Sequence, residues 1–158
     1  MTARSLTTRR SHRPYPSGLT GFIVDRQPLW LAIPEGHSLA SRNVVEPEQY
    51  AGEPFVATLL DMEIGFWGNI AAITPAGATL RVIVRVPDAF SVLTSVAAGV
   101  GLGVMSEGLT SIKMPGIVYR QIMKTNRSSD HVLVYRKNEG ATAIKAFIAM
   151  VRARSRSA

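Results

Sequence analysis

Hydrophobic and polar positions alternate with two different periods along the chain, and each change of period marks a predicted element. Short apolar or alternating runs bounded by turn-forming residues predict strands at 28–34, 54–59, 79–86, 102–106, 116–122 and 131–137. Apolar residues at helical spacing predict helices at 61–73, 88–99 and 141–155, with helical turns at 45–52 and 107–112. Strands that alternate with helices are typical of an α/β fold with three layers and a mainly parallel sheet.

The ends of two predicted helices carry recognisable capping residues. Asp61 and Asp88 each precede a helical run and are placed to accept a hydrogen bond from its first turn. Gly99 follows the run that Asp88 begins, where a helix favours a residue with positive φ. These signals predict that the second helix ends at Gly99 and leads directly into the strand at 102–106.

The stretch SVAAGVGLGVMS, residues 95–106, has glycines at every second position and no charge. A dinucleotide-binding loop has its glycines after a strand and before a helix, whereas these follow a helix and precede a strand. The uncharged run 89–106 approaches the length of a membrane span, yet it contains a capped helix and three glycines. The pattern therefore favours a buried helix, turn and strand over a phosphate loop or a membrane segment.

Composition and charge narrow the function. With 46% hydrophobic residues in 158, the chain is expected to form one compact domain, and the absence of cysteine excludes disulfides and thiolate metal sites. The net charge of +7 comes from the two ends, since residues 14–151 hold eleven acidic and eleven basic residues. Basic ends indicate weak, salt-sensitive nucleic-acid contact rather than a specific reader. The first ten residues lack the apolar core of a secretory signal, which favours a cytoplasmic location.

Candidate catalytic and metal-binding residues form no recognised pattern. The histidines His12, His37 and His131 have neither metal-ligand spacing nor a neighbouring carboxylate pair in the sequence. Ser106 lies in GVMSEG, which misses the G-x-S-x-G nucleophile motif by one residue. Asp61 and Glu63 are two residues apart and point away from each other on a helix. We therefore predict no catalytic residue, no metal and no cofactor, with Ser106 as a buried or capping serine.

Five successive blocks resemble one known family. They are PLWLAIPEGHSLA (28–40), AGEPFVATL (51–59), SVLTSVAAGVGLGVMSEGL (91–109), PGIVYRQI (115–122) and HVLVYRKNEGATAIKAFIAMVR (131–152). In order and spacing they are similar to the effector-binding domain of LysR-type transcriptional regulators. This resemblance implies the type 2 periplasmic-binding-protein fold, in which crossing strands join two α/β subdomains and a small effector lies between them. The outgoing crossing strand would be at Pro28 and the returning one at His131.

The resemblance covers only part of that family's chain. A winged helix-turn-helix, a linker helix and the first subdomain have no counterpart here, so the chain is similar to the second subdomain plus the last helix of the first. We expect a disordered basic lead-in at 1–20, a partial effector-binding domain at 21–152 and a basic tail at 153–158. DNA would then be contacted only through a winged-helix domain absent from this chain.

The predicted ligand wall lies where strands end and helices begin. Ligands of α/β sheets bind at the carboxyl ends of strands, near helix N-termini. The residues that meet this description are Thr58, Leu59 and Leu60 after one strand and Pro87, Asp88 and Phe90 after the next. The resemblance also implies that the loop 58–60 faces the effector, with Pro34 close by. Alternatively, Thr58 only satisfies backbone groups at the strand end and Leu60 packs on the following helix.

The expected partners are a small-molecule effector, with a carboxylate as one option, and a second copy of the chain; no membrane partner is expected. Ile144, Phe147, Ile148 and Val151 form an apolar stripe on the last helix, and another surface is expected to cover it. That cover is a second copy, the chain's own sheet or a separately supplied segment, and we favour a homodimer. Two other functions stay open: a solute-binding protein of the same fold, disfavoured by the missing signal sequence, and an enzyme, disfavoured by the missing catalytic motif.

Overall fold

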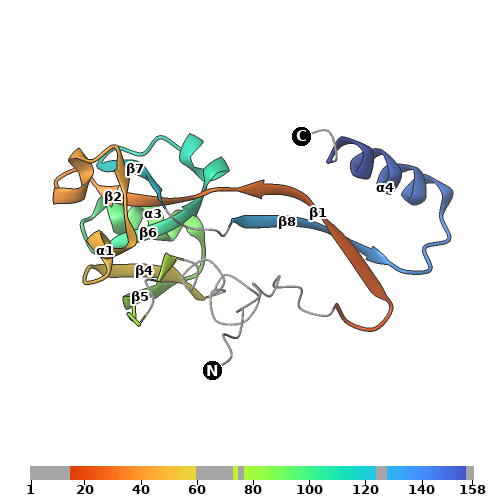
Figure 1. Ribbon diagram of the computed structural model, residues 1–158, viewed down its shortest axis with the longest axis horizontal. Helices are drawn as coiled ribbons and strands as arrows, with labels where there is room; N and C mark the ends of the chain where they lie inside the picture. Colours follow the sequence, from red (N-terminus) through yellow and green to blue (C-terminus); the bar gives the residue numbers. More distant parts are fainter. Residues whose placement is uncertain (1–14, 60–72, 75–76, 124–127, 156–158) are drawn as a thin grey trace, which may run out of the picture. The chain divides into compact units, whose positions relative to one another are not determined.

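A computed structural model describes residues 15–59, 73–74, 77–123 and 128–155 (Figure 1). The chain divides into two compact units, Arg26–His131 and a second unit formed by its two ends, up to Asp25 and from Val132 onward. Composition predicts the size of the apolar core but not the number of compact units that share it. Most of the predicted helix 61–73, and Leu60, lie outside the described residues.

The larger unit is built on a six-stranded sheet with the order β3-β7-β2-β6-β4-β5. The strands are β2 (Leu29–Pro34), β3 (Val44–Val45), β4 (Pro54–Thr58), β5 (Arg81–Val86), β6 (Leu102–Ser106) and β7 (Ile117–Ile122). In this sheet β4 is parallel to β5 and β6, β3 is parallel to β7, and β2 is antiparallel to β6 and β7. The sheet is mainly parallel, as predicted.

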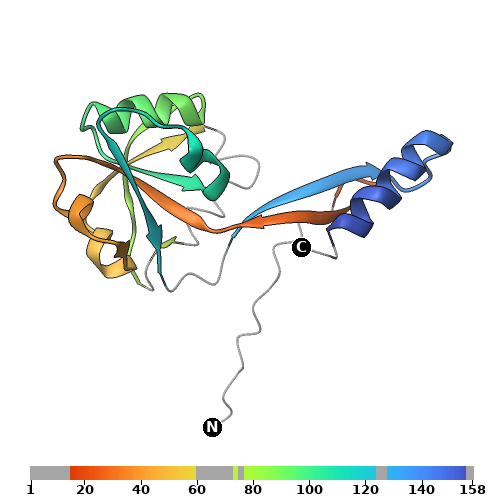
Figure 2. The same ribbon diagram turned by 90° about the horizontal axis from the view of Figure 1, so that it is seen from above.

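Helical elements lie on both faces of this sheet (Figure 2), and an apolar cluster packs on each face. One cluster includes Val92, Leu93 and Val96 of α3 (Ala89–Ala97), which pack against alternate residues of β2, β4 and β6. The other includes Leu39 of the 3₁₀ helix η1 (Ser38–Ser41) and Tyr50 of α1 (Pro47–Tyr50). Because successive strand residues point to opposite faces, the two clusters lie on the two sides of the sheet.

The turn after α3 confirms the interpretation of the glycine-rich stretch. Asp88 Oδ1 accepts from Ser91 N at 2.8 Å, and Gly99 has φ +77° immediately after the helix. A Cβ at Gly101 would lie 2.6 Å from the backbone oxygen of Pro54. The glycines therefore allow a sharp helix end and a close approach of β6 to β4.

One strand was not predicted from the sequence. β1 (Leu19–Gln27) forms a two-stranded sheet with β8 (Ser129–Arg136), and Figure 1 shows that they run in opposite directions. The crossing pair is therefore β1 with β8, and the assignment of the outgoing strand to Pro28 is wrong. β2 belongs to the six-stranded sheet instead. β1 also overlaps the last two residues of the predicted lead-in 1–20.

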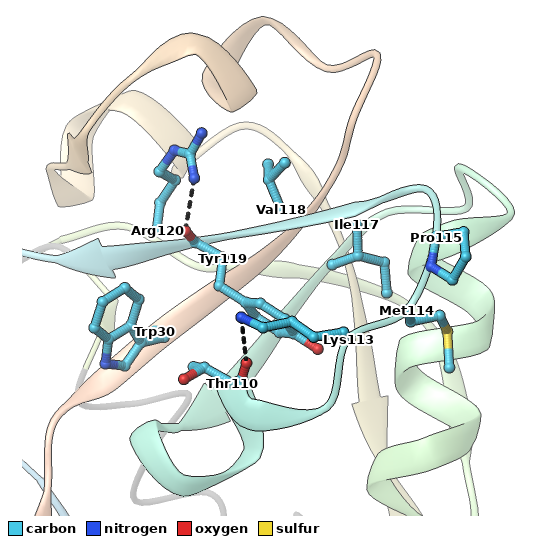
Figure 3. A pocket seen from close by; sticks show the side chains of 9 residues that line it. All are labelled: Trp30, Thr110, Lys113, Met114, Pro115, Ile117, Val118, Tyr119 and Arg120. Carbon is cyan, nitrogen blue, oxygen red and sulfur yellow. Dashed lines mark hydrogen bonds between the residues drawn. The ribbon is translucent and has the colours of Figure 1, made fainter.

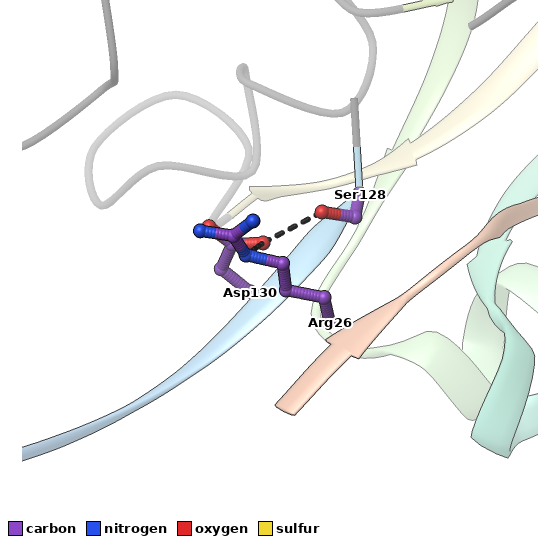
Figure 4. Close-up of polar contacts among 3 residues, drawn as sticks. All are labelled: Arg26, Ser128 and Asp130. Carbon is purple, nitrogen blue, oxygen red and sulfur yellow. Dashed lines mark hydrogen bonds and ion pairs between the residues drawn. The ribbon is translucent and has the colours of Figure 1, made fainter. Parts of the chain in front are cut away.

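An exposed polar cluster joins the end of β1 to the start of β8 within the larger unit (Figure 4). Arg26 Nε lies 4.0 Å from Asp130 Oδ1, and Ser128 Oγ donates to the same oxygen at 2.7 Å. The side chains of Arg26 and Asp130 are 62% and 36% exposed, so solvent screens the ion pair and its contribution to stability is small. We assign this cluster a structural role.

The smaller unit combines β1 up to Asp25 and β8 from Val132 with α4 (Thr142–Arg154). Phe22 and Tyr135 meet edge to face with ring centroids 6.3 Å apart. Arg152 lies 4.7 Å above the Phe22 ring and donates to Tyr135 Oη at 2.6 Å. These contacts hold the end of α4 on the two strands through cation–π and hydrogen-bond interactions.

We predict that Gly101→Ala lowers the free energy of unfolding by about 1–3 kcal/mol, because its Cβ collides with backbone that cannot turn away. Urea unfolding followed by circular dichroism measures the loss. Gly36→Ala is the control, since its Cβ would meet nothing within 4 Å. Equal effects of the two substitutions would contradict the close approach of β6 to β4.

Candidate functional site

Strand register brings the predicted polar residues to one edge of the sheet. Thr58 pairs with Val86 across the parallel strands β4 and β5, so it lies beside the segment that continues into Pro87 and Asp88. β6 runs parallel to β4 on the other side and ends at Ser106. The carboxyl ends of three neighbouring strands therefore meet here, as the general rule for ligand sites in α/β sheets requires.

Two hydroxyl groups are buried at this edge. Thr58 is 6% exposed and Ser106 is 8% exposed, and they are the buried polar residues of the described chain. Ser106 begins the 3₁₀ helix η3 (Glu107–Ser111) without capping it through its side chain. The prediction that Ser106 is buried is confirmed, whereas the alternative role as a side-chain cap is not.

The N-terminus of α3 adds polar backbone to the same edge. The first amides of a helix have no intrahelical acceptor, and the Asp88 carboxylate accepts one of them, from Ser91, at 2.8 Å. The carboxylate also places a negative charge at the positive end of the helix dipole. The amides of Ala89 and Phe90 precede Ser91 and likewise have no acceptor within the helix.

The flanking apolar residues are exposed. Leu59 is 54% exposed and Phe90 is 60% exposed, and Pro87 and Asp88 are exposed as well. Exposed large apolar side chains beside buried hydroxyls form a surface with both apolar and hydrogen-bonding character. Leu60, also predicted here, lies outside the described residues.

Pro34 does not belong to this edge. It ends β2 and pairs with Ile117, the first residue of β7. Because β2 is antiparallel to its neighbours, its end lies at the amino-terminal edge of the parallel strands, opposite to Thr58. The expectation that Pro34 lies close to Thr58 is therefore wrong, and the error follows from treating β2 as the crossing strand.

His37 has a structural role that the sequence did not reveal. Its Nδ1 accepts from Leu39 N at 3.2 Å and so caps η1, which leaves the proton of the neutral ring on Nε2. Nε2 lies 3.3 Å from Glu53 Oε2. This carboxylate is distant in sequence, so no local motif could predict the pair.

In the described part of the chain, no group of three His, Cys, Asp or Glu side chains is placed to hold a metal ion. No described helix is both long and apolar enough to cross a membrane.

Comparison with known proteins points to one family. The sequence profile of the LysR substrate binding domain matches residues 8–156. The HTH-type transcriptional regulator XapR of Escherichia coli (strain K12) is 24% identical over 135 residues, which cover 85% of this chain and 45% of XapR. The chain thus spans about half the length of this relative.

Solved structures share the fold at low sequence identity. The BenM effector binding domain with its effector benzoate is 17% identical, with a TM-score of 0.75 over 87% of this chain and 63% of that chain. The effector binding domain of QuiR in complex with shikimate is 14% identical, with a TM-score of 0.75 over 91% and 68% of the two chains. Full-length CbnR complexed with target DNA is 19% identical, with a TM-score of 0.74 over 90% and 48%. These matches confirm the predicted fold class.

We predict that Asp88→Ala lowers the free energy of unfolding by about 0.5–2 kcal/mol, whereas Asp88→Asn changes it by only a few tenths, because asparagine keeps the oxygen that accepts from Ser91 N. Chemical denaturation of both variants measures the difference. An equal loss in both would mean that the charge on Asp88, rather than the cap, stabilises α3.

Proposed function

The chain belongs to the LysR substrate-binding domain family, and from this membership we propose that it senses a small-molecule effector as part of a transcriptional regulator. The observation that carries the proposal is the polar edge of the sheet, where Thr58 and Ser106 lie buried beside the start of α3. We propose that Thr58, Leu59, Leu60, Pro87, Asp88 and Phe90 form one wall of the effector site.

A small carboxylate is the proposed class of effector. Hydroxyl groups and helix-terminal amides donate hydrogen bonds to anions, and these donors gather at the edge formed by β4, β5 and β6. Benzoate and shikimate, the ligands of the BenM and QuiR domains, carry this chemistry and support the choice. The Asp88 carboxylate repels the negative charge of the effector, so the effector's carboxylate would lie nearer Thr58 than Asp88.

We propose a binding function rather than catalysis, in the cytoplasm and without a membrane partner. Thr58 and Ser106 offer hydroxyls, but a hydroxyl needs an adjacent base to become a nucleophile, and the described contacts of His37 are with Leu39 N and Glu53. Any contact of the regulator with DNA would come from a winged-helix domain rather than from the effector-binding domain. The basic residues at the two ends would give only weak duplex binding, lost as salt rises.

We predict that Thr58→Val and Phe90→Ala each weaken carboxylate binding about tenfold or more, since one removes a buried hydroxyl and the other an exposed ring. Shikimate and benzoate are the probes, and isothermal titration calorimetry measures the dissociation constant.

Ile83→Ala is the matched control, because Ile83 is also an exposed apolar residue of β5 but lies in mid-strand. Two results would contradict the proposal. One is that neither carboxylate binds the chain, and the other is that the three substitutions have equal effects.

We also propose that the chain is a homodimer through its smaller unit. Ile144, Phe147 and Met150 of α4 are 44%, 51% and 53% exposed, and Val132 and Val134 of β8 are 39% and 43% exposed. Ile148 and Val151, the other residues of the predicted stripe, are half-buried. Exposed apolar residues of this number on one small unit favour association.

For this dimer, Phe147→Glu is expected to shift the molecular mass measured by light scattering from dimer to monomer, because it buries a charge at the interface. Lys145→Glu, on the same helix, changes charge without removing an apolar side chain and should leave the dimer intact. An unmutated chain that stays monomeric at high concentration contradicts the dimer.

A further inference from the structure

A hollow on the larger unit lies apart from the proposed effector wall and shares no residue with it. It has a volume of about 600 Å³, within the range of small-molecule sites. Three parts of the unit line it (Figure 3): Trp30 on β2; Thr110 on η3 with Lys113, Met114 and Pro115 after it; and residues 117–120 on β7.

Two aromatic rings form part of the wall. Trp30 and Tyr119 lie on the same side of the sheet, because Trp30 pairs with Gln121 and Ala32 pairs with Tyr119 along β2 and β7. The Tyr119 ring is fixed, since its hydroxyl donates to Ile112 O at 2.8 Å, and burial raises its pKa so that it keeps this proton. Trp30 is half-buried, and in the described structure its Nε1 has no acceptor. The indole is thus held by packing alone.

The charge of the hollow comes from Lys113. Its Nζ lies 3.5 Å from Thr110 O, a long contact, and within the described residues it pairs with no carboxylate. No acidic residue is among those that line the hollow. Arg120 contributes little charge, because Figure 3 shows its side chain on the opposite side of β7 from Tyr119. Its guanidinium donates there to Tyr119 O and Ala40 O.

We propose that this hollow binds a small aromatic carboxylate, whose ring packs against Trp30 and Tyr119 and whose carboxylate pairs with Lys113. A flat ring packs favourably on aromatic side chains, and Met114, which also lines the hollow, adds a polarisable contact. A charge-assisted hydrogen bond from the lysine supplies the preference for an anion. η3 is also joined to β1 by the bond from Gly108 N to Gln27 Oε1 at 3.0 Å. A ligand in the hollow would contact η3, β2 and β7 together.

The test uses the full chain with Trp67→Phe, which leaves Trp30 as the single tryptophan. Benzoate is the probe, benzamide is its uncharged counterpart, and the indole N–H resonance of Trp30 reports binding by NMR. We expect a saturable shift with benzoate and at least tenfold weaker binding of benzamide.

Two lysine variants in this background distinguish specific binding of benzoate through Lys113 from non-specific attraction to any lysine. Lys113→Gln should weaken benzoate binding about tenfold or more, while Lys145→Gln, an exposed lysine on α4, should leave it unchanged. The proposal is overturned if the Trp30 resonance does not move at millimolar benzoate, if benzamide binds as well, or if both lysine variants have the same effect. Thr58→Val in the same titration should not alter the Trp30 shift, so failure here is distinct from failure of the effector wall.

Discussion

The close approach of α3 to β6 at Gly103 is the constraint on which the larger unit depends. A Cβ at this position would lie 2.7 Å from Val92 Cγ1 and 3.2 Å from Val96 Cγ2. With glycine there, α3 lies directly on the sheet and buries Val92, Leu93 and Val96 almost completely. This packing fixes where the helix begins. Its first residues therefore meet the end of β5 at the edge that also holds Thr58, and the polar character of that edge follows from the apolar packing beneath it.

Much of the fold was predictable because its signals are local. The strand 102–106, the Asp88 cap and the positive φ of Gly99 each depend on a few neighbouring residues, and each is confirmed. β1 was missed because its sequence, LTGFIVDRQ, mixes polar and apolar residues and its pairing partner β8 lies about a hundred residues away. The resulting displacement of the crossing strand explains why Pro34 was placed at the wrong edge. Strand direction is a property of pairing, and the sequence period does not encode it.

The candidate effector wall and the hollow differ in how far the sequence reveals them. The wall follows from a rule about strand ends, so Thr58 and Asp88 could be named from the element pattern alone. The hollow joins Trp30 to Tyr119 through the antiparallel pairing of β2 and β7. No motif links these positions. In the sequence Lys113 looks like an ordinary surface lysine, and only the fold places it in the same hollow as Trp30 and Tyr119. The pair of His37 and Glu53 is a similar case, in which a contact between distant residues gives a loop histidine a structural role.

The carboxyl edge of β4, β5 and β6 is the proposed binding site of a small carboxylate. Backbone amide shifts in a ¹⁵N NMR titration with shikimate test this binding, because they report all described residues except the prolines at once. The largest shifts are expected at Thr58, Leu59 and the first amides of α3, with no comparable change at the opposite edge around Pro34. Shifts centred on that opposite edge, or no saturable shift anywhere, would contradict it.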